Sequence, residues 1–249
     1  MDNGIRILGN TMRYLQDKID VSSNNLSNID TPGYKKDIVV GRAFNHILSD
    51  EMAHTVTRAY NQGMIRFEPG VYVDEIYTQF SQGGLQETNR PWDVAIQGNG
   101  FFVVESDIGP LYRRSMSMKT DMTGILTTDT GNPVMGQNGT IFIGDNDFTI
   151  EYNGTIRIDG EVVDQLNVVD FANPDQLQRG GNGGFMNAGA GFIPAQGDVL
   201  QGYLESSNVD LSEEMTNLIE INNRFTTSQR LIQMLDEISG IGANRLGKV

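Results

Sequence analysis

The sequence predicts an α+β fold, in which an N-terminal and a C-terminal helix pair as a coiled coil and enclose a central antiparallel β-rich domain. Two observations carry the prediction. Apolar residues recur at heptad spacing near both ends of the chain, and short β-branched or aromatic runs separated by Asn-Gly and Asp-Gly turns occupy the middle. A third agrees with them, since 29 glycines and a hydrophobic share of 38% are typical of a turn-rich β body.

The first helix is predicted from an apolar seam whose members are spaced 3, 4, 3, 4 and 7, with Ser22 at the remaining register position. The charged Arg13, Asp17 and Lys18 lie off this seam. The pattern suits an amphipathic helix lying on its own domain, and it also suits a helix built to pack against other helices. The seam residues are Ile5, Leu8, Met12, Leu15, Ile19 and Leu26.

The stretch NNLSNIDTPGYKK, residues 24–36, then ends the helix. Its Asn, Ser, Asp and Thr side chains compete for backbone hydrogen bonds, and Pro32 cannot continue a helix. We therefore expect a sharp turn of the chain at this point.

The second helix is predicted from spacings of 4, 3, 7, 7 and 3 near the C-terminus. Asp210 can cap its first turn, Glu213 can reach back to it, and Gly240 and Gly242 are expected to end it. A single helix of this size is marginally stable in water, so the other terminus is its economical partner. The seam residues are Leu211, Met215, Leu218, Phe225, Ile232 and Leu235.

The middle of the chain reads as β structure. Asn138-Gly139, Asn153-Gly154 and Asp159-Gly160 are hairpin signals at close spacing. We expect a β-rich outer domain at 90–204 and an extended connecting segment at 36–89. Residues 1–35 with 205–249 form the predicted terminal helical core, and the Gly-rich stretch 174–192 is expected to be a surface loop.

The composition offers little for catalysis. The chain has no cysteine and only two histidines, His46 and His54, which lie in no metal-ligand pattern. Asp145 and Asp147 begin like a calcium loop, but Ile150 stands where that loop needs glycine. We therefore predict no catalytic residue, no metal and no cofactor, and not an enzyme.

Charge and hydropathy limit the partners and the location. A net charge of -14 makes binding to nucleic acid unfavourable, because phosphates are repelled. No apolar run approaches the roughly 20 residues of a membrane helix, so we expect no membrane insertion. The first residues lack the apolar stretch of a secretory signal, which is expected of a cytoplasmic protein or of one exported without a cleaved signal.

Three segments resemble the bacterial flagellar axial proteins, in particular the rod and hook members. Residues 24–35 follow that family's Asn-rich N-terminal segment, with Ser27 in the usual alanine place. Residues 92–104, WDVAIQGNGFFVV, and 201–225, which contain GYLESSNV and EEM, are similar to its central and C-terminal segments. The matching N-terminal residues are Asn24, Asn25, Leu26, Asn28, Thr31, Gly33, Tyr34 and Lys35.

The resemblance implies a structural subunit of the flagellar basal-body rod, of the proximal or the distal class. It implies helical polymerisation through the terminal helices, transmission of torque from motor to hook, and export by the flagellar type III apparatus to an extracytoplasmic rod that spans the cell envelope. The implied partners are copies of the chain and other rod and hook proteins. The twelve seam residues are then the assembly interface, and the break at 24–36 is the boundary between inner and outer layers. The alternative function is a surface-exposed adhesin or cell-wall-binding module.

Overall fold

The computed structural model describes residues 2–43 and 71–246. It forms two compact units. One, the helical unit, comprises the described parts of Met1–Ser27, Asp37–Thr78 and Asp210–Val249, and the other, the β unit, comprises Asn28–Lys36 and Gln79–Val209. The predicted division into terminal core, connecting segment and outer domain stays a prediction about the assembled protein. His46 and His54 lie outside the described residues.

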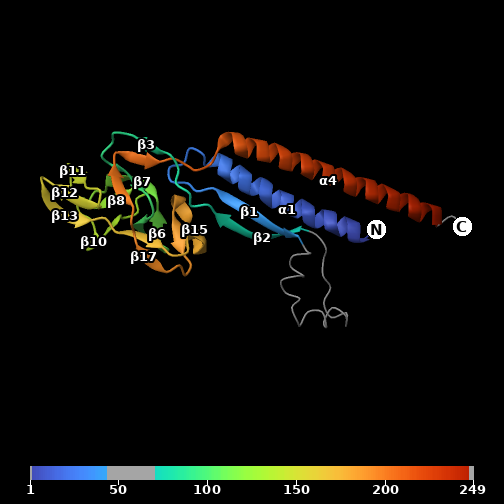
Figure 1. The fold of residues 1–249 in the computed structure, drawn as a ribbon, viewed down its shortest axis with the longest axis horizontal. Helices are drawn as coiled ribbons and strands as arrows, with labels where there is room; N and C mark the ends of the chain where they lie inside the picture. Colours follow the sequence, from blue (N-terminus) through green and yellow to red (C-terminus); the bar gives the residue numbers. More distant parts are fainter. Residues whose placement is uncertain (1, 44–70, 247–249) are drawn as a thin grey trace. The chain divides into compact units, whose positions relative to one another are not determined.

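The helical unit contains helix α1 (Asp2–Ser27), helix α4 (Leu211–Leu246) and the antiparallel pair of strands β1 (Asp37–Ala43) and β2 (Val71–Thr78). The two helices run side by side in opposite directions, and α1 also contacts both strands (Figure 1). A register shift between Val40 and Gly41 bends β1. At that bend a Cβ on residue 41 would stand 2.5 Å from the Tyr14 ring, so the glycine makes room for α1.

Helix α4 is longer than predicted. Gly240 lies inside it instead of ending it, and the helix continues to Leu246. Ser22 of α1 donates to the Glu214 carboxylate of α4, which fixes the axial alignment of the two helices. From that bond α1 extends ~30 Å back to Asp2 and α4 extends ~48 Å on to Leu246, at 1.5 Å per residue. The last ~18 Å of α4 therefore passes beyond the start of α1, as Figure 1 shows.

The predicted α+β fold class with a terminal coiled coil is wrong. Antiparallel strands make up 39% of the structure, and the described residues contain two α-helices. The heptad seams do not form the buried centre of the helix pair: of the twelve seam residues only Leu15 is buried, whereas α4 buries Glu214, Ile221 and Ser228. The physical reason is that α1 divides its surface between α4 and the β1–β2 hairpin, a partner that spacing alone cannot reveal.

The β unit contains the remaining strands. The first group is β3 (Leu85–Glu87), β4 (Asp93–Gln97), β5 (Phe101–Ser106), β6 (Gly109–Arg113), β7 (Ser115–Thr120), β8 (Leu126–Thr128), β9 (Met135–Gly136) and β10 (Gly139–Thr140). The second group is β11 (Phe148–Ile150), β12 (Thr155–Ile158), β13 (Glu161–Gln165), β14 (Val168–Phe171), β15 (Leu177–Arg179), β16 (Phe185–Asn187), β17 (Phe192–Pro194), β18 (Asp198–Gln201) and β19 (Tyr203–Glu205).

These strands form small antiparallel sheets. The largest has the order β15-β16-β6-β5-β14-β17, and a four-stranded sheet has the order β18-β4-β7-β8. A third has the order β11-β12-β13, while β9 pairs with β10 and β3 pairs with β19. The three predicted hairpin turns are confirmed. Asn153-Gly154 and Asp159-Gly160 lie between paired strands, and Asn138-Gly139 lies where β9 turns into β10, with Gly139 the first residue of β10. Asp159 and Gly160 both take positive φ, as a tight two-residue hairpin requires.

Strand β5 contains the continuous apolar run FFVV, residues 101–104. Successive side chains of a strand point to opposite faces, and here both faces are covered. Phe102 and Val104 belong to one core cluster, with Ile96, Met116 and others, while Phe101 and Val103 belong to a second cluster. The second cluster also contains Tyr112, Phe171, Leu177, Phe185 and Ala190.

The Gly-rich stretch 174–192 is not a surface loop, contrary to the prediction. It contains β15, β16 and two short 3-10 turns, Pro174–Gln176 and Gly181–Gly183. Leu177 and Phe185 anchor it in the second core cluster. The glycines misled the prediction because they lie between apolar residues that pack.

Candidate functional site

The N-terminal motif residues divide between the two units. In the helical unit Asn24 is exposed and Asn25 is buried. In the β unit Asn28 and Thr31 are half-buried, and Gly33, Tyr34 and Lys35 are buried. A polar motif that is largely buried calls for specific partners, because buried polar groups are costly unless they form hydrogen bonds.

Asn25 finds its partner in β1. Its amide donates to the Asp37 carbonyl at 2.8 Å and accepts from the Asp37 N–H at 3.0 Å, so the side chain pairs with this strand as a neighbouring backbone would. Asp37 in turn accepts from the Thr78 hydroxyl of β2 at 2.7 Å. Within the helical unit, Asn25 thus joins the end of α1 to the β1–β2 pair.

The turn after α1 is closed by its own backbone. The Thr31 N–H donates to the Asn28 carbonyl, and the Tyr34 N–H donates to the Thr31 carbonyl. Gly33 has φ +72°, a left-handed conformation that favours glycine, and its N–H donates to the Glu205 carbonyl at 2.6 Å. The turn therefore delivers the next two residues into the β unit.

Lys35 forms a buried ion pair with Glu205, and both side chains are fully buried. The Lys35 ammonium also donates to the Ser81 carbonyl at 2.7 Å, and Glu205 accepts from the Gly83 N–H at 2.9 Å. Desolvation by burial lowers the pKa of Lys35, and the facing Glu205 carboxylate opposes that effect. The pair joins the motif after α1 to the ESSNV motif near the start of α4.

Arg114 completes this charged cluster. Its Nε donates to Glu205 at 3.3 Å, and its two terminal nitrogens donate to the carbonyls of Gly100 and Gly98 at 2.6 Å each. These glycines belong to the QGNGFF segment of the central motif. All three sequence motifs therefore meet at Glu205, a meeting that no linear pattern indicates.

Arg179 holds the same segment from the Gly-rich stretch. Its guanidinium lies 4.3 Å from the centroid of the Tyr34 ring and 5.6 Å from that of Phe185, and it donates to the Lys35 carbonyl at 2.7 Å. Stacking between two aromatic rings and bonding to the main chain together fix Tyr34 and Lys35. Sequence reasoning missed Arg179 because it expected a loop there.

Asn208, of the ESSNV motif, bonds to two further segments of the β unit. Its Oδ1 accepts from the Lys36 N–H at 2.7 Å, and its Nδ2 donates to the Gln79 carbonyl at 2.8 Å. The same nitrogen donates to the carbonyl and the hydroxyl of Ser81, at 3.2 and 3.0 Å. The SNV spacing was recognised as a motif, but its bonding partners could not be read from the sequence.

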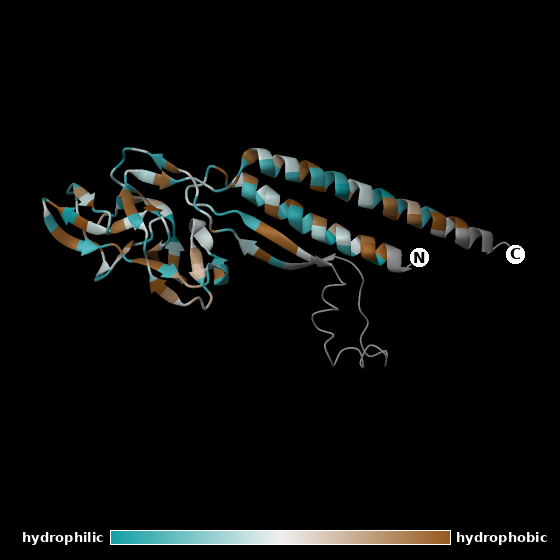
Figure 2. Ribbon diagram, viewed as in Figure 1, coloured by the Kyte–Doolittle hydropathy of each residue, from teal (hydrophilic) through white to brown (hydrophobic). Residues whose placement is uncertain are grey.

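The predicted assembly residues lie on both covered and exposed helix surfaces. Leu211 and Met215 are exposed, Leu15 is buried, and the other nine are half-buried, namely Ile5, Leu8, Met12, Ile19, Leu26, Leu218, Phe225, Ile232 and Leu235. Five further apolar residues of α4 are 44–62% exposed and were missed, namely Ile219, Leu231, Met234, Ile238 and Ile241. Figure 2 shows apolar residues at intervals along α4.

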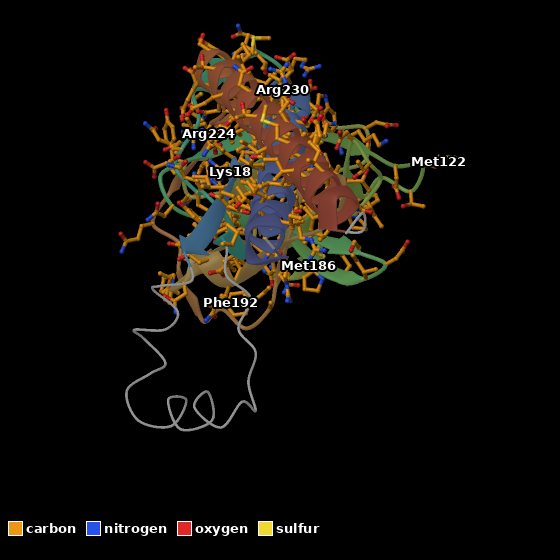
Figure 3. All side chains as sticks on the ribbon, turned by 90° about the vertical axis from the view of Figure 1, so that its right-hand side faces the viewer. Lys18, Met122, Met186, Phe192, Arg224 and Arg230 are labelled. Atoms are coloured by element: carbon orange, nitrogen blue, oxygen red, sulfur yellow. The ribbon has the colours of Figure 1, made fainter. Side chains whose placement is uncertain are left out.

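The last four of these missed residues, Leu231 to Ile241, are spaced 3, 4 and 3 and form a second seam, here called the outer seam. It could have been found by looking for a second heptad phase on the same helix. With 3.6 residues per turn, a buried face through Ile221 and Ser228 cannot include it. Figure 3, a view along the two helices, labels the charged side chains Lys18 of α1 and Arg224 and Arg230 of α4.

Each of the two units also has a hollow on its surface. Between α1 and α4 a groove of about 550 Å³ is lined by Thr11, Tyr14 and Leu15 on one side and by residues of α4 between Glu220 and Ser228 on the other. In the β unit a pocket of about 320 Å³ is lined by residues that include Phe80, Phe101, Phe171 and Arg114. Arg114 already bonds to Glu205 and two carbonyls.

Among residues 2–43 and 71–246, no group of three or more His, Asp or Glu side chains could hold a metal ion. Neither α1 nor α4, the helices in the described ranges, is long and apolar enough to cross a membrane. The arrangement is one of buried structural bonds and exposed apolar helix surface.

Three family models match the chain, in the order of the sequence motifs. Flagella basal body rod protein matches residues 5–35, the flagellar hook protein FlgE/F/G D1 domain matches 95–162, and the flagellar basal body rod FlgEFG protein C-terminal matches 200–246. Lys35 and Glu205, the buried ion pair, therefore join the first matched segment to the last.

Similar proteins cover almost the whole chain. Flagellar basal-body rod protein FlgG of Bacillus subtilis (strain 168) is 32% identical over 91% of this chain and 92% of its own length. FlgG of Agrobacterium fabrum (strain C58) is 33% identical over 93% and 94%. Flagellar hook-basal body complex protein FlhP of B. subtilis is 32% identical over 93% and 94%. These matches give no support to the adhesin alternative.

Proposed function

The chain belongs to the flagellar basal-body rod protein family, and from that premise we propose that it joins a helical rod through the outward faces of its terminal helices. It is a structural subunit of the rod, and it assembles with other rod and hook proteins of the basal body. The proposal concerns which surfaces make the contacts.

One observation carries this proposal: apolar side chains of the helical unit are exposed along one side of α4. Leu231, Met234 and Ile238 are 44%, 55% and 57% exposed along one seam. A heptad-spaced seam suits packing against another helix. The part of α4 that passes beyond α1 carries the far end of this seam, so a neighbouring subunit is its natural partner.

Polymerisation follows from the kind of contact. If the seam of one subunit packs against a different surface of the next, the contact is heterologous and generates an open helical filament. The twelve predicted seam residues join this proposal as candidate contacts, with Leu211 and Met215 the most accessible among them. Such a filament transmits torque because every subunit repeats the same contacts.

Further parts of the proposal concern location and partners. We propose that the flagellar type III apparatus exports the chain without a cleaved signal, and that the rod it builds is extracytoplasmic and spans the cell envelope. We also propose that the chain has no enzymatic activity. The buried charges of Lys35, Glu205 and Arg114 are committed to one another and to backbone groups, which supports a structural role.

Met234→Asp tests the contact surface. A charge in the outer seam should prevent rod assembly and abolish swimming, because burying an unpaired carboxylate in a subunit contact is strongly unfavourable. The monomer should stay folded, since Met234 is 55% exposed. The measurements are swimming of a complemented deletion strain and electron microscopy of its basal bodies.

Gln233→Asp is the matched control, because residue 233 is exposed on the same turn but points about 100° away. It should assemble normally. Normal rods with Met234→Asp, or equal loss from both variants, would show that the outer seam makes no subunit contact.

A further inference from the structure

The chain passes between the two units at four places, the peptide bonds 27–28, 36–37, 78–79 and 209–210. On the β-unit side of three of these bonds stand Lys36, Gln79 and Val209. Asn208, one residue before the last crossing, bonds through its side chain to the other two: the Lys36 N–H at 2.7 Å and the Gln79 carbonyl at 2.8 Å. One amide thus links the three segments at the ends where they leave the β unit.

Main-chain bonds join the same segments. The Gln79 N–H donates to the Lys36 carbonyl at 2.8 Å, and the Asn208 N–H donates to the Tyr34 carbonyl at 3.4 Å. The Asn208 amide also reaches Ser81, so it grips the second segment at two residues. The three segments are bound to one another before any of them leaves the unit.

The chemistry of this position suits asparagine. One oxygen accepts from an N–H while one nitrogen donates to three oxygens, so both ends of the amide are used. An aspartate has no donor and would set its charge against the oxygens of Gln79 and Ser81. These bonds are in part solvent-exposed, and such hydrogen bonds add only modestly to global stability. The role of these bonds therefore follows from their position at the crossings and not from their contribution to global stability.

The helical unit braces its own side of two crossings in the same way. Asn25 bonds to both backbone groups of Asp37, and Thr78 bonds to the Asp37 carboxylate. Residues 37 and 78 are the first and last of that unit at the crossings 36–37 and 78–79. Each unit, taken by itself, thus ties its ends of these crossings together, the β unit through Asn208 and the helical unit through Asp37.

On the premise of the function proposed above, we propose that Asn208 is a positioning residue for load transfer. It makes three segments leave the β unit as one braced group, so that torque carried by the helices is shared among them. Without it, each segment takes load separately and the main-chain bonds between them open more readily.

Asn208→Ala tests this in the full-length chain, with Asn187→Ala as the matched control. Asn187 makes three side-chain hydrogen bonds, against four for Asn208, but all are to Gly189 and Ala190 in its own turn. In purified protein, amide hydrogen exchange at Lys36 and Gln79 should become roughly fivefold to tenfold faster in Asn208→Ala, the effect of losing one or two modest hydrogen bonds. Asn187→Ala should leave both amides unchanged.

The second measurement is swimming speed as the viscosity of the medium is raised. A loss of folding stability alone lowers the amount of rod at every viscosity, whereas a lost brace matters only under load. Asn208→Ala cells should match the wild type in dilute medium and fall far below it in viscous medium. Asn187→Ala cells should follow the wild type throughout, and Asn208→Asp should repeat the Asn208→Ala result.

Unchanged exchange at Lys36 and Gln79 in Asn208→Ala would overturn the bracing role, and a wild-type load curve would overturn the load-sharing role. Failure of the proposed function looks different. If cells lacking the chain swim as well as the wild type at every viscosity, the chain carries no rod load and load sharing falls with it, while the exchange experiment still decides whether Asn208 braces the segments.

Discussion

The β unit and the helical unit differ in what they bury. Both buried apolar clusters lie in the β unit, although some of its apolar residues, such as Met122 and Phe142, are exposed. The buried charges Lys35, Glu205 and Arg114 of this unit are paired with one another. The helical unit buries Glu214 and Ser228 on α4 while Ile219 and Ile238 stay exposed. A subunit of a polymer can leave apolar surface exposed where neighbouring subunits will cover it. It also needs one part that is stably folded before assembly.

Removing residues 1–27 should have the largest effect, and it tests whether the two units differ as described. Without α1, the remaining helical unit loses the partner of α4 and of the β1–β2 pair, so we expect no entry into rods and no swimming. The β unit should keep its fold, because its clusters contain no residue of α1.

The only tryptophan, Trp92, packs on the first cluster of the β unit and contacts Phe148, so its fluorescence reports on that unit. Urea unfolding followed at Trp92 should have the same midpoint with and without residues 1–27. Loss of the β-unit transition in the shortened chain would show that the two units do not differ as described.

Glu205→Ala tests the same comparison in the β unit. It leaves Lys35 and Arg114 buried without their counter-ion, and breaking a buried ion pair by removing one partner costs about 3–5 kcal/mol. We expect the free energy of unfolding of the β unit to fall by that amount, measured by urea denaturation at Trp92.

The double variant Lys35→Met with Glu205→Gln is the control for that experiment. It removes the Lys35 and Glu205 charges, while Arg114 keeps its bonds to the Gly98 and Gly100 carbonyls. It should therefore recover part of the lost stability, because one buried charge fewer is left without a counter-ion. A double variant as unstable as Glu205→Ala would mean that the unpaired Lys35 charge is not the source of the cost.

Gly33→Ala should have the smallest effect of the three. Residue 33 has φ +72°, and the added Cβ would stand 3.3 Å from the Ser115 nitrogen. A left-handed conformation costs an ordinary L-residue about 1–2 kcal/mol, so the β unit should lose about that much stability. Gly131→Ala is a useful comparison, because that glycine has a similar φ of +89° but has nothing near its Cβ position; a larger loss there than at Gly33 would contradict the role of the Ser115 contact.

Several features were predictable because their causes are local. The hairpins at Asn138, Asn153 and Asp159 follow from turn chemistry, and the cap at Asp210 is confirmed by its bond to the Glu213 N–H at 2.9 Å. The family resemblance rested on three short segments, and all three are matched by family models. The prediction for the Gly-rich stretch was wrong because the packing of Leu177 and Phe185 overrode local preference. The predicted end of α4 at Gly240 was wrong because a glycine inside a helix costs only about 1 kcal/mol relative to alanine and need not end it.

By itself, the sequence determined that two helices at the ends of the chain flank a β-rich middle, where the tight turns lie, and which family the chain belongs to. Only the tertiary structure decided that α1 shares its surface between α4 and a hairpin, that Glu205 gathers Lys35 and Arg114, and that Asn208 joins three segments. The physical reason is range: spacing and turn chemistry act over a few residues, whereas these contacts join residues 91 to 172 positions apart and depend on the packing of the whole chain.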